Sequence, residues 1–436
     1  MHNSEHSSPH GQRQRHPERS RPQPGQNQQQ DRRHPARRRN PDHRHQHPRP
    51  VPQQNAQPSY RPEVPAGAEV EISGVVEILP NGTGFLRQFE TDLQPSQDDG
   101  FLGTSLIRDE KLETGMLVKA VARGGGQKGP AVTKILEING RPREEYTMPV
   151  PFERQMAVDP EERFILTPSR TPLIERSMRL LELMTPIGKG QRALIVAPPK
   201  TGKTTLLHDL AASIADHHPE TVIVVLLVDE RPEEVTHFKR AVQGIVIASS
   251  ADKEAASHLR AARLTLEMGR SLAESGKDVF LLLDSITRLG RASNREEANR
   301  GKTLSGGVGS RALEFPRRFF GSARNLENGG SLTIVATALI DTGSRMDEVI
   351  FQEFKGTGNM ELVLDRRLAE LRMFPAVDLN QSGSRKEEKI LPPAWLNAAH
   401  KLRRHLASLK LQDAMDVLMT RLEKAESVEA FCSSIQ

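Results

Sequence analysis

The segment 197–205, Ala-Pro-Pro-Lys-Thr-Gly-Lys-Thr-Thr, has the residue types and spacing of a loop that binds nucleotide phosphates. In such a loop, small residues let backbone N–H groups point at the phosphates, a lysine reaches the β- and γ-phosphates, and a hydroxyl contacts Mg²⁺. Gly202, Lys203 and Thr204 supply that core, and Ala197 stands where the usual GxxxxGK[ST] pattern begins with glycine. The strand-like run RALIV precedes the loop and the helix-like run TLLHDLAASIA follows it. This order predicts a binding site for a nucleoside triphosphate with Mg²⁺.

Carboxylates that end two apolar runs form the second group of candidate residues. VFLLLD ends at Asp284, and TVIVVLLVDE ends at Asp229 and Glu230. An open α/β sheet binds its ligand at the carboxyl ends of its strands. We therefore expect Asp284 to hold magnesium and Glu230 to act as the base that aligns water for attack on the γ-phosphate. The alternative is that these acids are solvated strand ends or helix N-caps, and for Asp284, which SITR follows, capping is a real competitor.

The elements that must position these residues are apolar strands alternating with helical stretches from about residue 168 onward. The strands are RALIVA, TVIVVLLV, GIVIAS, DVFLLLD and SLTIVATALI, and KEAASHLRAARLTLEMGRSLAE is typical of the segments between them. This alternation predicts a parallel sheet covered on both faces. The end of the chain, from Pro393 to about Ser433, is expected to be helical, because Leu402, Leu406 and Leu409 form one apolar stripe.

Residues 68–142 have a different pattern, with short β-like runs separated by turn signals. The runs are VEISGVVEIL, NGTGFLRQ, FLGTSLI, MLVKAVA and AVTKILEI. Five short strands in a segment of this length predict an OB or cold-shock barrel, a fold whose open face often binds single-stranded nucleic acid. An SH3-like barrel or a purely structural module fits the pattern as well.

The first 62 residues are rich in Pro, Gln, Arg and His. They hold twelve arginines, no lysine and four acids, a net charge of +8, which leaves −3 for the rest of a chain whose total is +5. This composition buries too little apolar surface to offset the entropy of folding, so the tail is predicted to be disordered. Its arginine run, 32–39, would attract nucleic acid. A solubilising tail is an equally good interpretation.

The chain has no sequence feature of a membrane or exported protein. No run of eighteen apolar residues occurs, and the start, MHNSEHSSPHGQRQRH, lacks the apolar region of a secretory signal. We therefore expect no membrane contact and a cytoplasmic protein. The single cysteine, Cys432, leaves no internal disulfide to form.

Long strings in the second half of the chain resemble the bacterial transcription termination factor Rho family. They are APPKTGKT, LLVDERPEEVTHF, LLLDSITRL, FFGSARN, GGSLTIVATALIDTGSRMDEVIFQEFKGTGNMEL and SGSRKEE, and the likeness covers roughly residues 70–425. Alanine at position 197 is what this family carries. The resemblance implies a RecA-like P-loop ATPase that forms a homohexameric ring, binds nascent RNA and hydrolyses ATP between subunits with Mg²⁺. It also implies 5′-to-3′ RNA/DNA helicase activity that dislodges RNA polymerase, with antitermination and elongation factors as further partners.

The same resemblance implies roles for individual residues of the ATPase half. Glu230 would polarise the attacking water, Asp284 would be the Walker B acid, and Arg385 would be an arginine finger from the adjacent subunit. Arg372 would be a second inter-subunit arginine, and Phe374 would pack near adenine. The remaining nucleotide contacts would be Gly188, Lys189, Gly190, Gln191, Arg192, Ala193, Lys200, Thr201, Gly202, Lys203, Thr204, Thr205 and Arg231.

In the barrel, the resemblance implies an RNA-binding cleft around NGTGFLR, where Thr83 replaces the first of two expected aromatic residues and Phe85 is the second. Phe101 aligns with a further aromatic, whereas positions 127–130 offer none. The cleft residues would be Gly82, Thr83, Gly84, Phe85, Leu86, Arg87, Asp99, Gly100 and Phe101. Two loops would face RNA in a central channel, through Lys302, Thr303, Leu304, Ser305, Gly306, Gly307 and Arg345.

These expectations give four segments: a basic tail at 1–62, an OB/cold-shock-like RNA-binding domain at 68–142, a linker at 143–167, and a RecA-like ATPase domain with C-terminal helices at 168–436. The leading hypothesis is an ATP-driven RNA translocase that terminates transcription. A rotary-type proton or flagellar ATPase subunit is the alternative, because it shares the same core and an upstream barrel. A nonenzymatic RNA-binding protein would not need the phosphate loop, Glu230 and Asp284.

Overall fold

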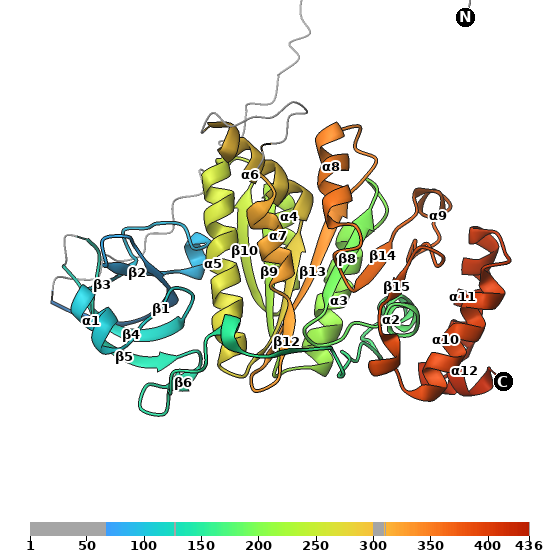
Figure 1. Cartoon of the computed structure of the whole chain (residues 1–436), viewed down its shortest axis with the longest axis horizontal. Helices are drawn as coiled ribbons and strands as arrows, with labels where there is room; N and C mark the ends of the chain where they lie inside the picture. The colour runs from blue at the N-terminus through green and yellow to red at the C-terminus, as the bar shows by residue number, and fades with distance from the viewer. Residues whose placement is uncertain (1–66, 126–127, 300–308, 310, 436) are drawn as a thin grey trace, which may run out of the picture. The chain divides into compact units, whose positions relative to one another are not determined.

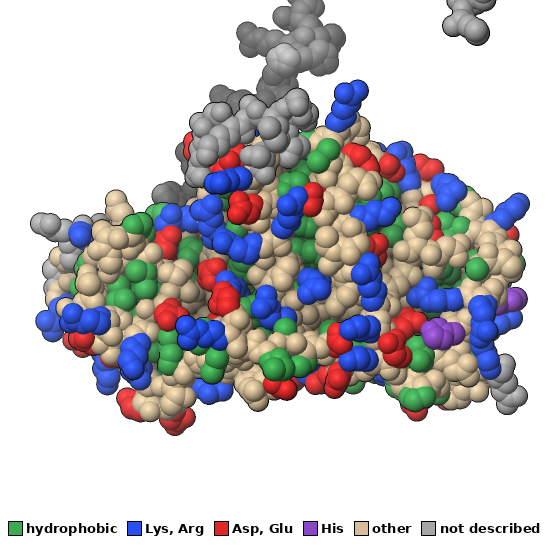
Figure 2. All heavy atoms as spheres, in the orientation of Figure 1, with side chains coloured by type: hydrophobic (Ala, Val, Ile, Leu, Met, Phe, Trp, Pro, Cys, Tyr) green, Lys and Arg blue, Asp and Glu red, His purple; other side chains and the backbone are tan. Residues whose placement is uncertain are grey.

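The structure is a computed structural model of the 436-residue chain that describes residues 67–125, 128–299, 309 and 311–435 (Figure 1). The predicted tail and the predicted channel loop at 302–307 lie outside these ranges. All of the described residues belong to one compact unit, Pro62–Gln436. In the described ranges, no helix has the length and apolar character needed to cross a membrane. Lys and Arg side chains are interspersed with Asp and Glu over the face drawn in Figure 2.

The predicted barrel is present. Its strands run in the order β3-β2-β1-β4-β5-β6, and a pairing between β3 and β5 closes the sheet on itself. The interior holds apolar residues such as Val76, Leu86, Val118 and Ile135. The strands are β1 (Glu69–Ile78), β2 (Gly84–Arg87), β3 (Gly100–Leu102), β4 (Leu117–Arg123), β5 (Ala131–Ile138) and β6 (Arg141–Pro142), with the short helix η1 (Phe89–Thr91) after β2.

One predicted strand of the barrel is wrong in part. FLGTSLI was expected to be extended throughout, but only β3 is a strand, and α1 (Thr104–Asp109) follows it after Gly103. The helix packs Leu106 and Ile107 against the barrel core. These two apolar residues are adjacent rather than alternating with polar ones, a pattern that suits a helix covering the end of a barrel better than a strand with one wet face.

The predicted parallel sheet forms the centre of the ATPase half. Six parallel strands follow the order β10-β9-β11-β13-β8-β14. Three short antiparallel strands bring the sheet to nine: β15 pairs with β14 at one edge, and β12, with β7 beside it, pairs with the interior strand β13. The main strands are β8 (Arg192–Ala197), β9 (Val222–Glu230), β10 (Ile245–Ser250), β11 (Asp278–Asp284), β13 (Ser331–Leu339) and β14 (Met360–Val363). The short ones are β7 (Ala157–Val158), β12 (Arg324–Leu326) and β15 (Gly383–Ser384).

The segment expected to be a linker, 143–167, contributes to this fold. β7 pairs with β12, which in turn pairs with β13, and the 3-10 helix η2 (Phe152–Arg154) buries Phe152 completely in the core. The segment is therefore held against the ATPase half over part of its length.

Helices cover both faces of the sheet, as predicted (Figure 1). Along β9, Ile223, Val225 and Leu227 enter one core while Val224 and Leu226 enter the other, as the period-two geometry of a strand requires. The first core lies under α2 (Pro172–Met184), α3 (Lys203–His217), α4 (Pro232–Ala241), α9 (Arg366–Glu370), α10 (Pro393–Leu406), α11 (Leu411–Lys424) and α12 (Val428–Ser434). The second lies under α5 (Ala255–Glu274), α6 (Ile286–Asn299), α7 (Glu314–Gly321) and α8 (Arg345–Phe354). One further 3-10 helix, η3 (Glu387–Lys389), precedes α10.

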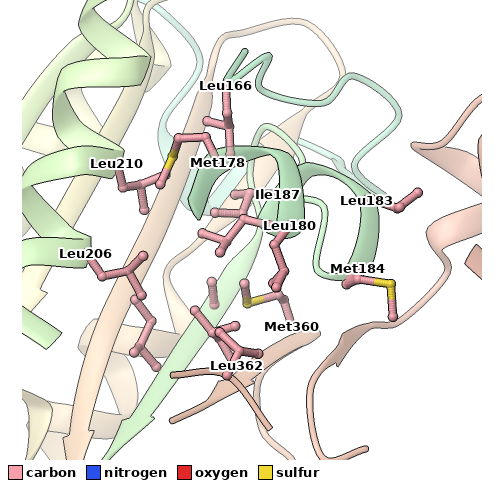
Figure 3. Packing of buried hydrophobic residues seen from close by; sticks show 14 of the residues in the cluster. Leu166, Met178, Leu180, Leu183, Met184, Ile187, Leu206, Leu210, Met360 and Leu362 are labelled. Atoms are coloured by element: carbon pink, nitrogen blue, oxygen red, sulfur yellow. The ribbon is translucent and has the colours of Figure 1, made fainter. Parts of the chain in front are cut away.

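The first core fixes the helix that follows the phosphate loop. Figure 3 shows Leu206 and Leu210 of α3 converging with Met178 of α2 and with Leu362 of β14. Leu210, Met178 and Leu362 are fully buried. Because this packing leaves α3 little freedom to shift, the start of the helix is held at one position relative to the ends of the strands.

Polar contacts join the barrel to the ATPase half. Asn139, in the turn after β5, is 1% exposed and donates from Nδ2 to the Ser271 carbonyl (3.1 Å) and to the Ser271 and Ser275 hydroxyls (3.0 and 2.8 Å) of the α5 region. Its Oδ1 accepts from the Leu117 N–H at 2.9 Å. Asp92 forms a second junction, bonding Lys239 and the backbone N–H of Ala248.

We predict that Asn139→Ala destabilises the protein by about 2–3 kcal/mol, because it leaves buried donors and acceptors without partners and places Ala at a positive φ of 51°. The measurement is the melting temperature and urea unfolding beside Asn397→Ala, which changes an exposed residue of α10. Equal stability of the two variants would contradict the assignment of Asn139 as a junction residue.

Candidate functional site

The phosphate loop lies between β8, which ends at Ala197, and α3, which begins at Lys203. Gly202 precedes the helix with φ of +82°, a conformation that glycine adopts without strain. Thr201 stabilises the turn by donating from Oγ1 to the Pro198 carbonyl at 2.8 Å. The order of strand, loop and helix is the one predicted, and the first backbone N–H groups of α3 are available to an anion at its N-terminus.

Two carboxylates are buried at the carboxyl edge of the sheet beside this loop. Asp284, which ends β11, is 1% exposed, and Glu230, which ends β9, is 3% exposed. Asp284 bonds the Lys203 ammonium and accepts from the Thr337 hydroxyl at 2.7 Å. Glu230 bonds the Arg288 guanidinium, which also donates to the Asp229 carbonyl at 2.5 Å. The structure thus brings together Lys203, Glu230 and Asp284, which the sequence predicted separately.

Burial and the negative charge of Asp284 raise the pKa of Glu230 to about 7. Desolvation is the larger cause, since a carboxylate loses hydration in this position. A carboxylate with a pKa near neutrality is suited to accept a proton from water at physiological pH. This environment fits the predicted role of Glu230 as a base.

The residues predicted to hold magnesium fit that ion chemically. The Thr204 hydroxyl, on the first turn of α3, and the Asp284 carboxylate are hard oxygen ligands at the same edge of the sheet. Thr204 Oγ1 donates to Glu234 Oε2 at 3.5 Å, a long contact that a cation would readily replace. When bound, Mg²⁺ would neutralise charge on the phosphates, while Lys203 and the loop amides would orient them.

A cavity of about 170 Å³ opens on the other side of the phosphate loop. Phe374 forms one wall, and its ring lies so close to the loop that a Cβ on Gly202 would be 3.1 Å from it.

Arg372, two residues before Phe374, is exposed at a positive φ of 60°, and Arg231 is exposed at the N-cap of α4. Lys200 and Thr205 are also exposed at the loop. Phe374, Arg372 and Arg231 are therefore on the same edge as the phosphate loop.

The other predicted nucleotide contacts lie at the amino ends of the strands, opposite the phosphate loop. Lys189 precedes β8 and bonds Glu162 (2.6 Å) and Asp278 (2.9 Å), the latter being the first residue of β11. Gln191 binds back to the Gly188 N–H at 2.5 Å, and Gly190 donates to Thr333 at 2.7 Å. Within one chain, the stretch 188–192 thus lies at the amino end of β8, whereas the phosphate loop lies at the carboxyl end. Ala193 and the rest of the strand separate the two.

Arg385 belongs to this second group. Its backbone N–H donates to the Asn359 carbonyl at 2.7 Å, and Asn359 Oδ1 accepts from the Arg192 N–H at 2.8 Å. The exposed Arg385 side chain lines a hollow of about 200 Å³ together with Asp159, Pro160, Gln191, Arg192, Asn359, Lys386 and Ile390. Five strand steps, about 16 Å, separate Arg192 from Ala197. An arginine side chain does not span that distance, so Arg385 does not reach the phosphate loop of its own chain.

The barrel presents two aromatic rings that the sequence predicted as RNA contacts. Phe85 and Phe101 lie on paired strands with ring centroids 5.7 Å apart, in an edge-to-face arrangement, and both are partly exposed. Lys128 lies over Phe101, with Nζ 5.1 Å from the ring centroid. Partly exposed rings next to a cation are the groups that stack bases and attract their phosphates.

Arg87 and Asp99 are placed behind these rings. Arg87 is 4% exposed and bonds Glu77 and Asp99, each at 2.6 Å, while its guanidinium lies 4.6 Å from the Phe85 centroid. Asp99 is fully buried, and burial raises its pKa. Two carboxylates thus hold the Arg87 guanidinium beside the Phe85 ring. A contact of Arg87 with RNA stays a prediction.

The remaining predicted barrel residues surround the rings. Thr83 is partly exposed and bonds Asn81 through both its N–H (3.1 Å) and its hydroxyl (2.8 Å), so it caps the turn before β2. Gly82 is in that turn with φ of +82°. Gly84, Leu86 and Gly100 are buried and form the strand pairs that hold Phe85 and Phe101 in register.

Arg345 is the one predicted channel residue that the structure describes. It is exposed at the start of α8, beyond the carboxyl end of β13, and Asp347, two residues further along the helix, binds Arg291 of α6. Asn294 of α6 contacts both the Met346 sulfur (3.3 Å) and the Gly309 N–H (2.8 Å). Gly309 and the start of α8, where Arg345 lies, are therefore near each other.

Arg288 is the main site residue that we did not predict. It follows Asp284 by four residues and lies in the first turn of α6, which begins at Ile286. This position places its guanidinium against Glu230 at the carboxyl ends of the strands. A basic residue at that spacing after a strand-terminal acid was the available signal.

Two protein families match the chain. The model described as Rho termination factor, RNA-binding domain, matches residues 72–144, and that described as ATP synthase alpha/beta family, nucleotide-binding domain, matches residues 177–384.

Curated relatives named transcription termination factor Rho align with most of the chain. The protein of Thermotoga maritima is 49% identical over 364 residues, 83% of this chain and 84% of the relative. Those of Cereibacter sphaeroides and Salmonella typhimurium are 46% and 45% identical, over 85% and 84% of this chain and 88% of each relative.

Two solved structures are similar in fold. One is an ATPase from the type III secretion system of pathogenic bacteria, with a TM-score of 0.55 and 23% identity over 64% of this chain and 86% of the other. The other is EscN of enteropathogenic E. coli, solved with its central stalk EscO, with a TM-score of 0.52 and 23% identity over 66% and 73%.

The raised pKa of Glu230 predicts a pH dependence of stability in the nucleotide-free protein. Between about pH 4.5 and 7 the folded protein keeps a proton that the unfolded chain has lost, so the free energy of unfolding falls as the pH rises. Glu230→Gln abolishes this titration, and its stability relative to wild type should improve by about 1–3 kcal/mol from pH 4.5 to 8. Urea unfolding across this range, with the exposed Glu233→Gln as control, measures the effect. Parallel curves for Glu230→Gln and wild type would rule out the perturbed pKa.

Proposed function

This chain belongs to the Rho family of transcription termination factors, and on that basis we propose that it works as a homohexameric, ATP-driven 5′-to-3′ RNA translocase and helicase. Termination of transcription, RNA binding by the barrel domain and an ATPase domain come with membership of the family. The ring, the direction of movement, the helicase activity and the role of Mg²⁺ are parts of the proposal. So are contact with RNA polymerase and with antitermination or elongation factors, and a cytoplasmic location, where nascent RNA is made.

The observation that carries the ring proposal is the separation of Arg385 from the phosphate loop of its own chain. An arginine finger stabilises the charge that develops on the transferred phosphoryl group and must approach it closely. Arg385 lies at the amino end of β8 and Lys203 at the carboxyl end. A second copy that presents its Arg385 edge to the Lys203 edge of the first would complete the site. The neighbouring residues Gln191 and Arg192 would then meet the nucleotide from that second copy.

The alternative of a rotary proton or flagellar ATPase subunit is weaker. The secretion ATPases share the fold at 23% identity, whereas the termination factors reach 45–49% over most of the chain. The barrel adds the pair Phe85 and Phe101 to this argument, since a ring subunit that binds no nucleic acid does not need partly exposed aromatic residues there.

We predict that Phe85→Ala weakens binding of short pyrimidine RNA by about 1–3 kcal/mol, the value of one base stacked on one aromatic side chain. Phe85→Leu is the matched variant, because leucine keeps apolar volume but has no ring face. Oligomer titration and thermal melts separate the possibilities. If leucine restores both binding and melting temperature, Phe85 serves only the barrel core and the stacking role is lost.

We predict that Arg385→Ala lowers RNA-stimulated ATP hydrolysis by roughly 10³-fold or more, the effect of an arginine finger, without loss of ATP binding. Glu230→Gln rings should also be inactive. Mixing the two variants creates interfaces with an intact Glu230 site and an intact Arg385, so hydrolysis should partly recover. Arg404→Ala, an exposed change on α10, should behave as wild type. Mixed rings no more active than either parent would argue against action in trans.

A further inference from the structure

An acidic side chain that the proposed mechanism does not use faces the cavity beside the phosphate loop. The cavity has apolar walls from α2, α3 and the segment around Phe374, and its polar side chains are three hydroxyls and one carboxylate. Its lining residues are Leu173, Ser177, Thr201, Gly202, Thr205, Leu206, Asp209, Leu364, Phe374, Pro375 and Ala376. Among the described residues that line the cavity, Asp209 is the sole ionisable one.

The position of Asp209 is fixed by helix geometry. Thr205 and Asp209 are four residues apart on α3 and so lie on one face of the helix, in line with Gly202 at its start. Seven residues of helical rise place Asp209 about 10 Å beyond Gly202 along the axis. The packing of Leu206 and Leu210 in the core, visible in Figure 3, keeps this face of α3 turned to the cavity.

The Asp209 carboxylate is half-buried without compensation. Within the ranges that the structure describes, it has neither a hydrogen bond nor an ion pair, and burial alone raises its pKa to about 6. At neutral pH it is therefore mostly ionised, and it can only accept hydrogen bonds. A half-buried acceptor without a partner on the wall of a cavity is a group that a ligand's donor would satisfy.

A nucleotide with its phosphates at Lys203 and Thr204 would bring a base to this cavity. The Phe374 ring and the leucines offer apolar surface to the faces of a base, and the exposed Leu173 (64%) lies at the rim. The cavity and the phosphate loop share Thr201, Gly202 and Thr205, so the two sites are continuous. The group on the base that an ionised carboxylate favours is an exocyclic amine, whereas a carbonyl oxygen at the same place would be repelled.

From this geometry we infer that Asp209 accepts a hydrogen bond from the 6-amino group of adenine and thereby makes the site select ATP over nucleotides that lack this amine. The inference rests on the proposed ATPase function and adds a specificity-determining residue to it. Phe374 and the leucines hold any purine, and Asp209 distinguishes among purines by what stands at position 6.

The test compares RNA-stimulated hydrolysis of three nucleotides: ATP, purine riboside triphosphate, which has hydrogen at position 6, and inosine triphosphate, which has an oxygen there. The wild-type protein should show a kcat/KM for ATP about tenfold or more above either analogue, the range expected for a hydrogen bond to a charged group. Asp209→Asn can donate to an oxygen, so it should narrow the gap between ATP and inosine triphosphate by about tenfold. Asp216→Asn, on the same helix but paired with Arg170 away from the cavity, should leave the ratios unchanged.

Two results would overturn the inference: equal kcat/KM of the wild-type protein for ATP and purine riboside triphosphate, or wild-type ratios in Asp209→Asn. The first comparison needs no variant, so a folding defect in Asp209→Asn leaves the inference testable. Failure of the wild-type protein to hydrolyse any of the three nucleotides in the presence of RNA would instead contradict the proposed function.

Discussion

Two carboxylates, Glu230 and Asp284, are buried at one edge of the sheet, and the chemistry of the molecule depends on how their charges are balanced. Two neighbouring carboxylates that are buried away from water would not both be ionised unless cations were bonded to them. Lys203 from the phosphate loop bonds Asp284, and Arg288 from α6 bonds Glu230. A triphosphate that takes Lys203 must therefore alter the environment of Asp284 and, through it, of Glu230. The phosphate loop, the proposed metal ligand Asp284 and the proposed base Glu230 are thus one electrostatic unit.

The parallel sheet keeps Arg385 away from this electrostatic unit. Because all main strands run the same way, their carboxyl ends gather Ala197, Glu230 and Asp284 at one edge, while their amino ends gather Lys189, Gln191 and Arg192 at the other. Arg385 joins the second group through Asn359. Under the proposed function, a single chain would therefore carry the two halves of a nucleotide site at opposite ends of the strands. Head-to-tail association of identical chains would bring such halves together, and a closed ring would use every half.

Features encoded locally were predictable from the sequence. The phosphate loop, the strand-terminal acids and the apolar strands each depend on a few consecutive residues, and the structure has the predicted strands and loop where they were expected. FLGTSLI was misjudged because strand and helix both accept a short apolar run, and only packing on the barrel separates them. Contacts between distant segments were not predictable: Arg87 binding Glu77 and Asp99, Arg192 meeting Asn359, and Arg288 meeting Glu230 all depend on the completed fold. The residues of 302–307 lie outside the described structure, and their roles stay predictions.

Our proposal requires two copies for hydrolysis: one supplies Lys203, Glu230 and Asp284, and the other supplies Arg385. The most direct measurement is the specific rate of ATP hydrolysis, at saturating ATP and RNA, over a dilution series in which the oligomeric state is determined in parallel by mass. If the claim holds, the rate per chain follows the fraction of assembled protein and falls roughly 10³-fold or more in the isolated chain, as expected when an arginine finger is withdrawn. A rate per chain that stays constant through dissociation to single chains would contradict it.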